Sequence, residues 1–99
     1  MHIISKKKIK EFWDKHPESK SALEAWFKIV RVANYKSLNE LKATFPKADK
    51  VGERIVFDIG GNKYRLITVI HFNRGKVYVR DVLTHADYDK EQWKHGSHH

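Results

Sequence analysis

The chain has 99 residues, of which 40% are hydrophobic and 32% charged, a composition typical of a soluble globular domain and too short for a (β/α)8 barrel or a two-domain enzyme. Twenty lysines and arginines against 12 aspartates and glutamates give a formal net charge of +8, which favours a polyanionic partner, nucleic acid first. The chain has no cysteine, which excludes disulfides, thiol nucleophiles and cysteine-based zinc sites. We expect one domain over residues 1–95, because residues 96–99 (Gly-Ser-His-His) resemble the stub of an expression tag.

Neither a membrane span nor a secretory signal is expected. No run approaches 18 apolar residues. The basic stretch Lys6, Lys7 and Lys8 leads into a polar helix and not into an apolar segment. Together with the absence of cysteine, these features predict a cytoplasmic protein.

The N-terminal third predicts a short strand and two helices. The run His2-Ile3-Ile4-Ser5 is typical of a strand, and Ser5 is placed to cap a helix that begins at Lys6. Pro17 ends or redirects this helix, and a second helix begins near residues 17–19. Apolar residues recur at helical spacing in both, so Trp13 and Trp26 are predicted to lie in the core. The two stripes are Ile9, Phe12, Trp13 and His16, and Leu23, Trp26, Phe27, Val30 and Ala33.

A third, short helix is expected after Ser37. The sequence Ser37-Leu38-Asn39-Glu40 has the S-x-x-E pattern of a capping box. Leu38, Leu41 and Phe45 share one face of the helix, and Pro46 closes it. Residues 47–52 are expected to form a loop.

The second half predicts three strands and a last helix. Residues 54–59, 63–72 and 76–83 are rich in β-branched residues and are separated by the glycine-containing turns 60–62 and 73–75. Thr84 is placed to cap a helix through Trp93, with Asp87 in its first turn. Helices followed by a three-stranded meander predict an α+β fold with one sheet.

Alternation along the strands assigns side chains to the two faces of the sheet. It places Arg65, Ile67, Val69 and His71 on one face, and Tyr64, Leu66, Thr68, Ile70 and Phe72 on the face toward the helices. In the last strand it places Tyr78 and Arg80 on one face and Val77, Val79 and Asp81 on the other.

Polar and aromatic residues cluster at the ends of these strands. They are Asn62, Lys63 and Arg65 at one turn, His71 in the middle of the sheet, Arg80 on the last strand, and His85 and Tyr88 just after it. Two interpretations of each arginine stay open: an anion site, or a cross-strand ion pair with Asp58 or Asp81. His85 is equally either a proton-transfer residue or a residue of the helix cap.

These residue types suit RNA cleavage without a metal. The reaction needs a base for the 2′-OH, cations for the phosphate and an acid for the leaving 5′ oxygen. His85, Arg65, Arg80 and Tyr88 have suitable side chains, with tyrosine a usable acid or a stacking platform. No P-loop, dinucleotide fingerprint, H-E-x-x-H or G-x-S-x-G motif is present, and neither a metal nor a cofactor is expected.

The sequence resembles the HigB toxins of bacterial toxin–antitoxin modules, a branch of the RelE/ParE-like superfamily. The resemblance extends from His2 to Trp93. The segments that carry it are residues 10–13 (Lys-Glu-Phe-Trp), His16-Pro17, Leu23-x-x-Trp26, residues 56–66 with Gly60-Gly61-Asn62-x-x-Arg65, and residues 78–89 with Thr84-His85-x-x-Tyr88-Asp89.

The resemblance implies a RelE-like fold, with an N-terminal strand and helices packed on a curved antiparallel sheet and a short C-terminal helix. It implies an mRNA interferase that cuts translated mRNA in the ribosomal A site and so inhibits translation. It also implies a HigA-like antitoxin with a helix-turn-helix domain, through which alone the toxin would reach operator DNA.

The resemblance further implies roles for individual residues. Arg65 and Arg80 would stabilise the phosphate, His85 would be base or acid, and Tyr88 would stack or assist proton transfer. RNA and ribosomal RNA contacts are expected from Asn62, Lys63, Lys6, Lys7, Lys8 and His71.

Two other functions remain open at this point. A ParE-like protein of the same fold would poison DNA gyrase and need no catalytic set. A non-catalytic RNA- or ribosome-binding module would use the aromatic and basic residues for stacking and backbone contacts.

Overall fold

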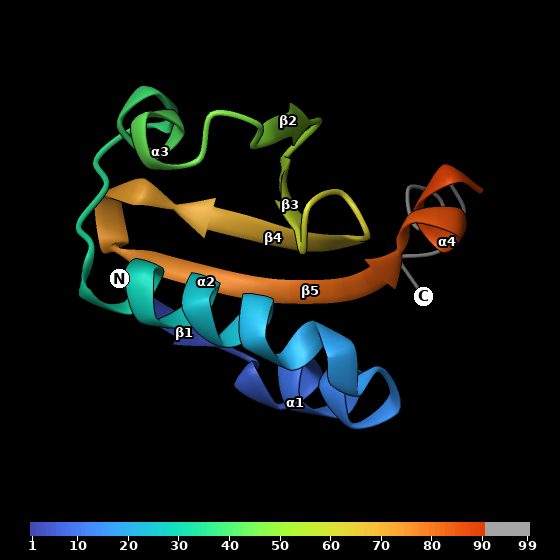
Figure 1. Cartoon of the computed structure of the whole chain (residues 1–99). Coiled ribbons are helices and arrows are strands. Elements are labelled where there is room, and N and C mark those ends of the chain that lie inside the picture. Colours follow the sequence, from blue (N-terminus) through green and yellow to red (C-terminus); the bar gives the residue numbers. More distant parts are fainter. Residues whose placement is uncertain (91–99) are drawn as a thin grey trace.

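The computed structural model describes residues 1–90 and combines four α-helices with five strands (Figure 1). The α+β class predicted from the order of elements is confirmed. No helix among these residues has the length and apolar character that crossing a bilayer requires. In chain order the elements are β1 (His2–Ile4), α1 (Lys6–Lys15), the 3₁₀ turn η1 (Pro17–Ser19), α2 (Lys20–Val32), α3 (Leu38–Thr44), β2 (Asp49–Val51), β3 (Arg54–Ile59), β4 (Tyr64–His71), the 3₁₀ turn η2 (Phe72–Arg74), β5 (Lys76–Thr84) and α4 (His85–Asp89).

The strands form one sheet in the order β1-β5-β4-β3-β2. Strands β3 to β5 pair antiparallel, as predicted, and β2 adds to them in the same sense, but β1 runs parallel to β5. The sheet is therefore mixed, which corrects the expectation of an antiparallel sheet. The physical reason is connectivity: most of the chain separates β1 from β5, and no tight hairpin turn imposes the antiparallel direction.

Strand β2 corrects the expected loop over residues 47–52. Its residues Asp49, Lys50 and Val51 pair with Val56, Ile55 and Arg54 of β3. Sequence reasoning missed it because three residues are too few for a period of two, and charged side chains hide the pattern. Charged residues are typical of an edge strand, because they discourage pairing with another chain.

Helices α1, α2 and α3 pack on one face of the sheet and enclose the main core. Trp26 is 2% exposed, which confirms its prediction as a core residue, whereas Trp13 is only partly buried at the edge of the core. Leu66 of β4 belongs to this core, as the alternation predicted. Other members are Ile9, Leu23, Val30, Leu41, Phe57, Val77 and Val79.

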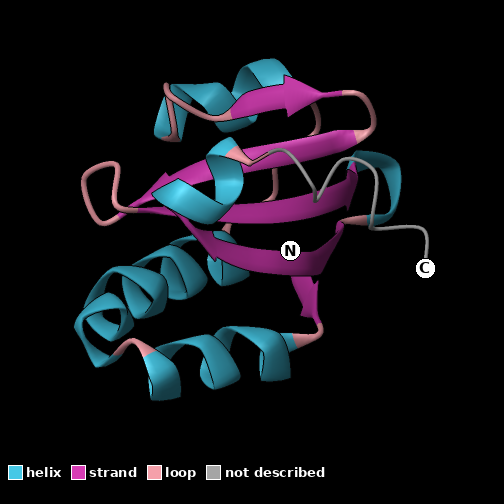
Figure 2. Cartoon of the chain, turned by 90° about the vertical axis from the view of Figure 1, so that its right-hand side faces the viewer, coloured by secondary structure: helices cyan, strands magenta, loops and turns pink. Residues whose placement is uncertain are grey.

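Helix α4 lies on the opposite face, in front of the strands in Figure 2. Its Tyr88 packs on a second, small apolar cluster around Val56 and Ile67. Val51 and Leu83 complete that cluster. The sheet is thus covered by three helices on one face and only by the short α4 on the other.

A β-bulge at Arg80 interrupts the alternation in β5. Ile67 pairs with Asp81 but the next residue, Thr68, pairs with Val79, so Arg80 is the extra residue. Beyond it, Val82 and not Asp81 continues the buried face of Val77 and Val79. The predicted face for Asp81 is therefore wrong, because one inserted residue moves every following side chain of β5 to the opposite face of the sheet.

The three expected helix caps differ in outcome. Thr84 Oγ1 accepts a hydrogen bond from Asp87 N at 3.2 Å, and Ser37 Oγ accepts one from Glu40 N at 3.3 Å, which confirms both caps. The reciprocal bond of a capping box is shifted by one residue, because Glu40 Oε1 accepts from Lys36 N and not from Ser37 N. Ser5 precedes α1 in a left-handed conformation (φ 72°) and makes no side-chain cap bond, so that expectation is wrong. Helix α4 ends at Asp89; the predicted end at Trp93 and the tag-like residues 96–99 lie outside the described residues.

A polar contact fastens the turn between α1 and α2 to β4. The hydroxyl of Tyr64, at the start of β4, donates to Glu18 Oε1 at 2.9 Å. A bond from its own backbone N–H and the bond from Tyr64 lower the pKa of Glu18, while burial and the nearby carboxylate raise the pKa of Tyr64. Both shifts keep Tyr64 a donor and Glu18 an ionised acceptor.

We predict that Glu18→Gln lowers the free energy of unfolding more at pH 7 than at pH 3. A carboxyl group whose pKa is lowered on folding stabilises the fold above its ordinary pKa of 4.5, and this contribution is lost as the pH falls through the folded value. Urea unfolding at both pH values measures the difference, with Glu53→Gln on an exposed turn as control. An equal loss at both pH values would contradict the assignment.

Candidate functional site

The turn between β3 and β4 brings Asp58 opposite Arg65. Gly60, Gly61 and Asn62 all have positive φ (65°, 61° and 86°), as their residue types predicted. A Cβ on Gly60 would also lie 3.2 Å from the Tyr64 ring, so this position requires glycine on two grounds. The resulting register pairs Asp58 directly with Arg65.

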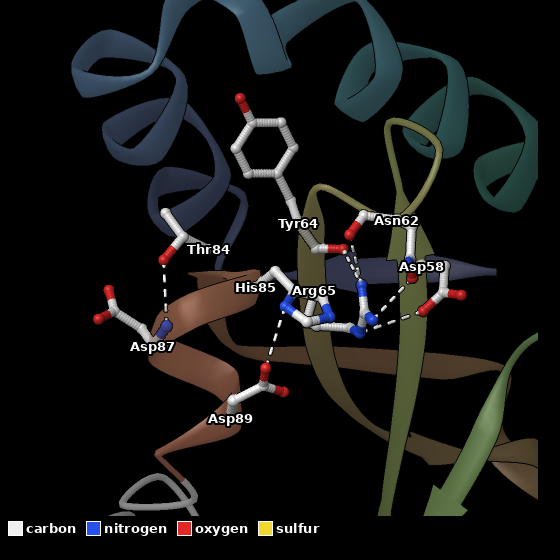
Figure 3. Close-up of polar contacts among 8 residues, drawn as sticks. All are labelled: Asp58, Asn62, Tyr64, Arg65, Thr84, His85, Asp87 and Asp89. Carbon is white, nitrogen blue, oxygen red and sulfur yellow. Dashed lines mark hydrogen bonds and ion pairs between the residues drawn. The ribbon is translucent and has the colours of Figure 1, made fainter.

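Arg65 is the centre of a polar network on the open face of the sheet (Figure 3). Its Nε lies 3.2 Å from Asp58 Oδ1. Its Nη1 donates to the carbonyls of Asn62 and Tyr64 at 3.1 and 3.2 Å, and its Nη2 donates to Asn62 Oδ1 at 2.7 Å. The guanidinium carbon also lies 5.4 Å from the centre of the Tyr88 ring.

These contacts decide between the two interpretations of Arg65. The cross-strand ion pair with Asp58 is confirmed. The two Nη atoms donate three hydrogen bonds, Nε lies beside the Asp58 carboxylate, and the residue is only 9% exposed. Arg65 is thus firmly held.

Helix α4 begins beside the same turn. The backbone N–H of His85 donates to the carbonyl of Lys63 at 3.0 Å, and Thr84 pairs with Tyr64 at the end of β5. The Thr84 cap and Asp87 in the first turn then start the helix. The sequence therefore brings His85, Tyr88 and Arg65 to one end of the sheet.

The His85 imidazole lies beside the carboxylate of Asp89 within α4. Its Nδ1 lies 3.1 Å from Asp89 Oδ2, and the two side chains are 46% and 60% exposed. A carboxylate on Nδ1 fixes the ring and its tautomer and leaves Nε2 for another partner. Hydrolases with a carboxylate behind the imidazole also place a carboxylate beside Nδ1, although there the carboxylate is buried.

Arg80 lies farther along β5. Its side chain is exposed. Arg65 pairs with Leu83 of β5, and Arg80 comes three residues before Leu83, which is about 10 Å along the strand. Its carbonyl accepts a hydrogen bond from Lys8 Nζ at 3.0 Å, which brings the start of α1 to the bulge. Next to it, partial burial raises the pKa of Asp81, an effect that Lys8 opposes.

The structure does not bring the remaining candidates into this cluster. His71 is at the far end of β4, six residues or about 20 Å from Arg65, where its ring meets the Tyr78 ring edge-on. Lys6 and Lys7 belong to the first turn of α1 on the helix side, and the Lys6 ammonium lies 4.6 Å from the centre of the Phe27 ring. Lys63 is exposed on the turn.

The sequence contained a signal for one functional contact that was missed. Asp89 follows His85 by four residues, the spacing at which side chains on a helix meet. The predicted helix from Thr84 through Trp93 contains both residues, so the pair follows from this spacing. Among the described residues, no three His, Asp or Glu side chains gather as a metal ion would require.

Comparison with known proteins gives one consistent result. A family model described as HigB toxin, RelE-like toxic component of a toxin-antitoxin system, matches residues 19–91. The chain is 35% identical over 92 residues to the mRNA interferase toxin HigB of Escherichia coli strain K12, covering 90% of this chain and 88% of that one. The same values hold for the mRNA interferase HigB of Shigella flexneri, and that of Escherichia coli O6:H1 is 33% identical over 93 residues, covering 91% and 90%.

We predict an energetic coupling between Asp58 and Arg65 of about 1–3 kcal/mol, because removing either partner leaves the other charge poorly paired in a mostly buried place. Urea unfolding of Asp58→Asn, Arg65→Met and the double variant measures it. Glu11→Gln, on the exposed face of α1, should combine additively with Arg65→Met. Additivity of Asp58→Asn with Arg65→Met would show that the pair contributes nothing.

Proposed function

Because the chain belongs to the HigB toxin family, as its motifs predicted, we propose that it is an mRNA interferase whose site lies at α4 and the β3–β4 turn. The toxin belongs to a toxin–antitoxin system and therefore has an antitoxin partner. The site assignment rests on the contact between His85 and Asp89 in α4. The first residue of this helix is hydrogen-bonded to the β3–β4 turn, to which Arg65 is also hydrogen-bonded.

The proposed reaction cleaves RNA through its own 2′-OH. The 2′ oxygen attacks the adjacent phosphorus, the bond to the 5′ oxygen breaks, and a 2′,3′-cyclic phosphate or, after water attack, a 3′ phosphate remains. One proton must leave the 2′-OH and one must reach the 5′ oxygen. The chemistry requires no metal, provided that cations stabilise the charge on the phosphate.

His85 is the proposed proton-transfer residue. Its Nδ1 is held by Asp89, so Nε2 is the atom that exchanges a proton with the substrate. The exposed position of the ring leaves room for an RNA backbone beside α4. Tyr88 packs beside Arg65 and is proposed to support a base or to assist the second proton transfer.

The two arginines have different proposed roles. Arg65 is held by three hydrogen bonds and the ion pair with Asp58, so its proposed role is to fix the site and to offer the phosphate its charge. Arg80 is exposed and can follow the substrate, so it is the proposed mobile phosphate ligand. Lys8 at the carbonyl of Arg80 adds positive potential there.

We propose that the substrate is mRNA on the translating ribosome, cut in the A site in the cytoplasm. The net charge of +8 supports contact with ribosomal RNA. Asn62 and Lys63 on the turn, with Lys7 and Lys8 at the start of α1, are the proposed RNA contacts, whereas the Lys6 ammonium lies over the Phe27 ring. The proposed antitoxin is HigA-like, with a helix-turn-helix domain, and operator DNA is reached only through it.

We predict that primer extension in a reconstituted translation system shows cuts at codon-spaced positions only when the ribosomes translate. An mRNA with a 2′-O-methyl group at the scissile nucleotide should stay intact there, because the nucleophile is blocked. Cleavage of the methylated mRNA would contradict 2′-OH attack. Intact natural mRNA, with cleaved DNA–gyrase complexes instead, would overturn the nuclease function.

A further inference from the structure

A basic groove runs between α1 and α2, on the face of the sheet away from α4. It encloses about 380 Å³. Ile9, Trp13 and Phe27 provide its apolar surface. Its charged lining consists of Lys6, Lys10, Lys20, Lys28, Arg31 and Glu24.

This groove carries much of the positive charge of the chain. Five cations and one carboxylate leave it a net charge of +4, half of the +8 of the whole chain. All five cationic residues are exposed. Like charges so close together repel one another, and an acidic partner would relieve that repulsion.

The aromatic rings favour a protein partner over single-stranded RNA. Lys6 Nζ lies 4.6 Å from the centre of the Phe27 ring, and Lys20 Nζ lies 5.6 Å from the centre of the Trp13 ring. A base would have to displace these ammonium groups in order to stack on the rings. Carboxylates can instead pair with the ammonium groups where they stand.

The outer surface of α2 supports the same conclusion. Among residues 1–90, the large hydrophobic side chains that stay exposed are Ile29 and Val32, at 43% and 77%, and both belong to α2. They directly follow the groove residues Lys28 and Arg31 in the chain. Apolar area beside a charged rim is typical of a protein–protein interface.

We propose that the α1–α2 groove binds an acidic, partly apolar segment of the antitoxin. The proposal rests on the family's antitoxin partner and not on the cleavage chemistry. Because α4 lies on the opposite face of the sheet, a segment in the groove would hold the toxin without touching His85 (Figure 2).

The test measures the affinity of the purified antitoxin of the same module for charge-reversed toxins. Lys10→Glu with Lys28→Glu should weaken binding about tenfold or more. Lys36→Glu with Lys42→Glu, exposed residues at α3, changes the net charge equally and should bind almost as the parent does. Val32→Ser should also weaken binding, and added salt should weaken the parent complex.

Two further readouts separate the possible outcomes. Equal melting temperatures exclude misfolding, and growth arrest by the groove variant without antitoxin shows an intact toxin. Equal antitoxin affinity of the groove and control variants would overturn the proposal. So would a groove variant that keeps the antitoxin but loses binding to 70S ribosomes, since the groove would then be an RNA surface. If the parent toxin cleaves no mRNA, only the proposed function fails, because the affinities are still measurable.

Discussion

The guanidinium of Arg65 is the interaction on which the open face of the sheet depends. It joins β3 through Asp58, the β3–β4 turn through Asn62, and α4 through the Tyr88 ring. Because α4 has only five residues, its own hydrogen bonds cannot hold it in place. The position of His85 therefore follows from packing around Arg65 and from the bond between the His85 N–H and the Lys63 carbonyl.

The two faces of the sheet differ in what they contain. The helix face contains the main core and the basic α1–α2 groove, whereas the open face has a small apolar cluster and the polar network around Arg65. Arg80 and His85 are exposed, whereas Arg65 is mostly buried and held by several polar contacts. The proposed site presents its groups on an exposed surface, which suits an RNA chain held by another assembly.

Sequence patterns predicted the elements with strong periodicity and the residues that side-chain chemistry singled out. The apolar stripe that buries Trp26, the positive φ of Gly60 to Asn62 and the Thr84 cap all follow from local rules. The parallel pairing of β1, the edge strand β2 and the bulge at Arg80 depend on distant parts of the chain, which local patterns do not contain. For the same reason the sequence could not separate His71 from the cluster of Arg65 and His85.

The most direct measurement is the single-turnover cleavage rate of mRNA on programmed ribosomes for His85→Ala and His71→Ala. Both variants remove an exposed imidazole; His71 ends β4, whereas His85 begins α4 beside the turn that precedes β4. Loss of a general acid or base should slow His85→Ala by about 10²–10⁴-fold, while His71→Ala should stay close to the parent rate. A parent-like rate for His85→Ala, or a comparable loss in His71→Ala, would contradict the placement of the site at α4.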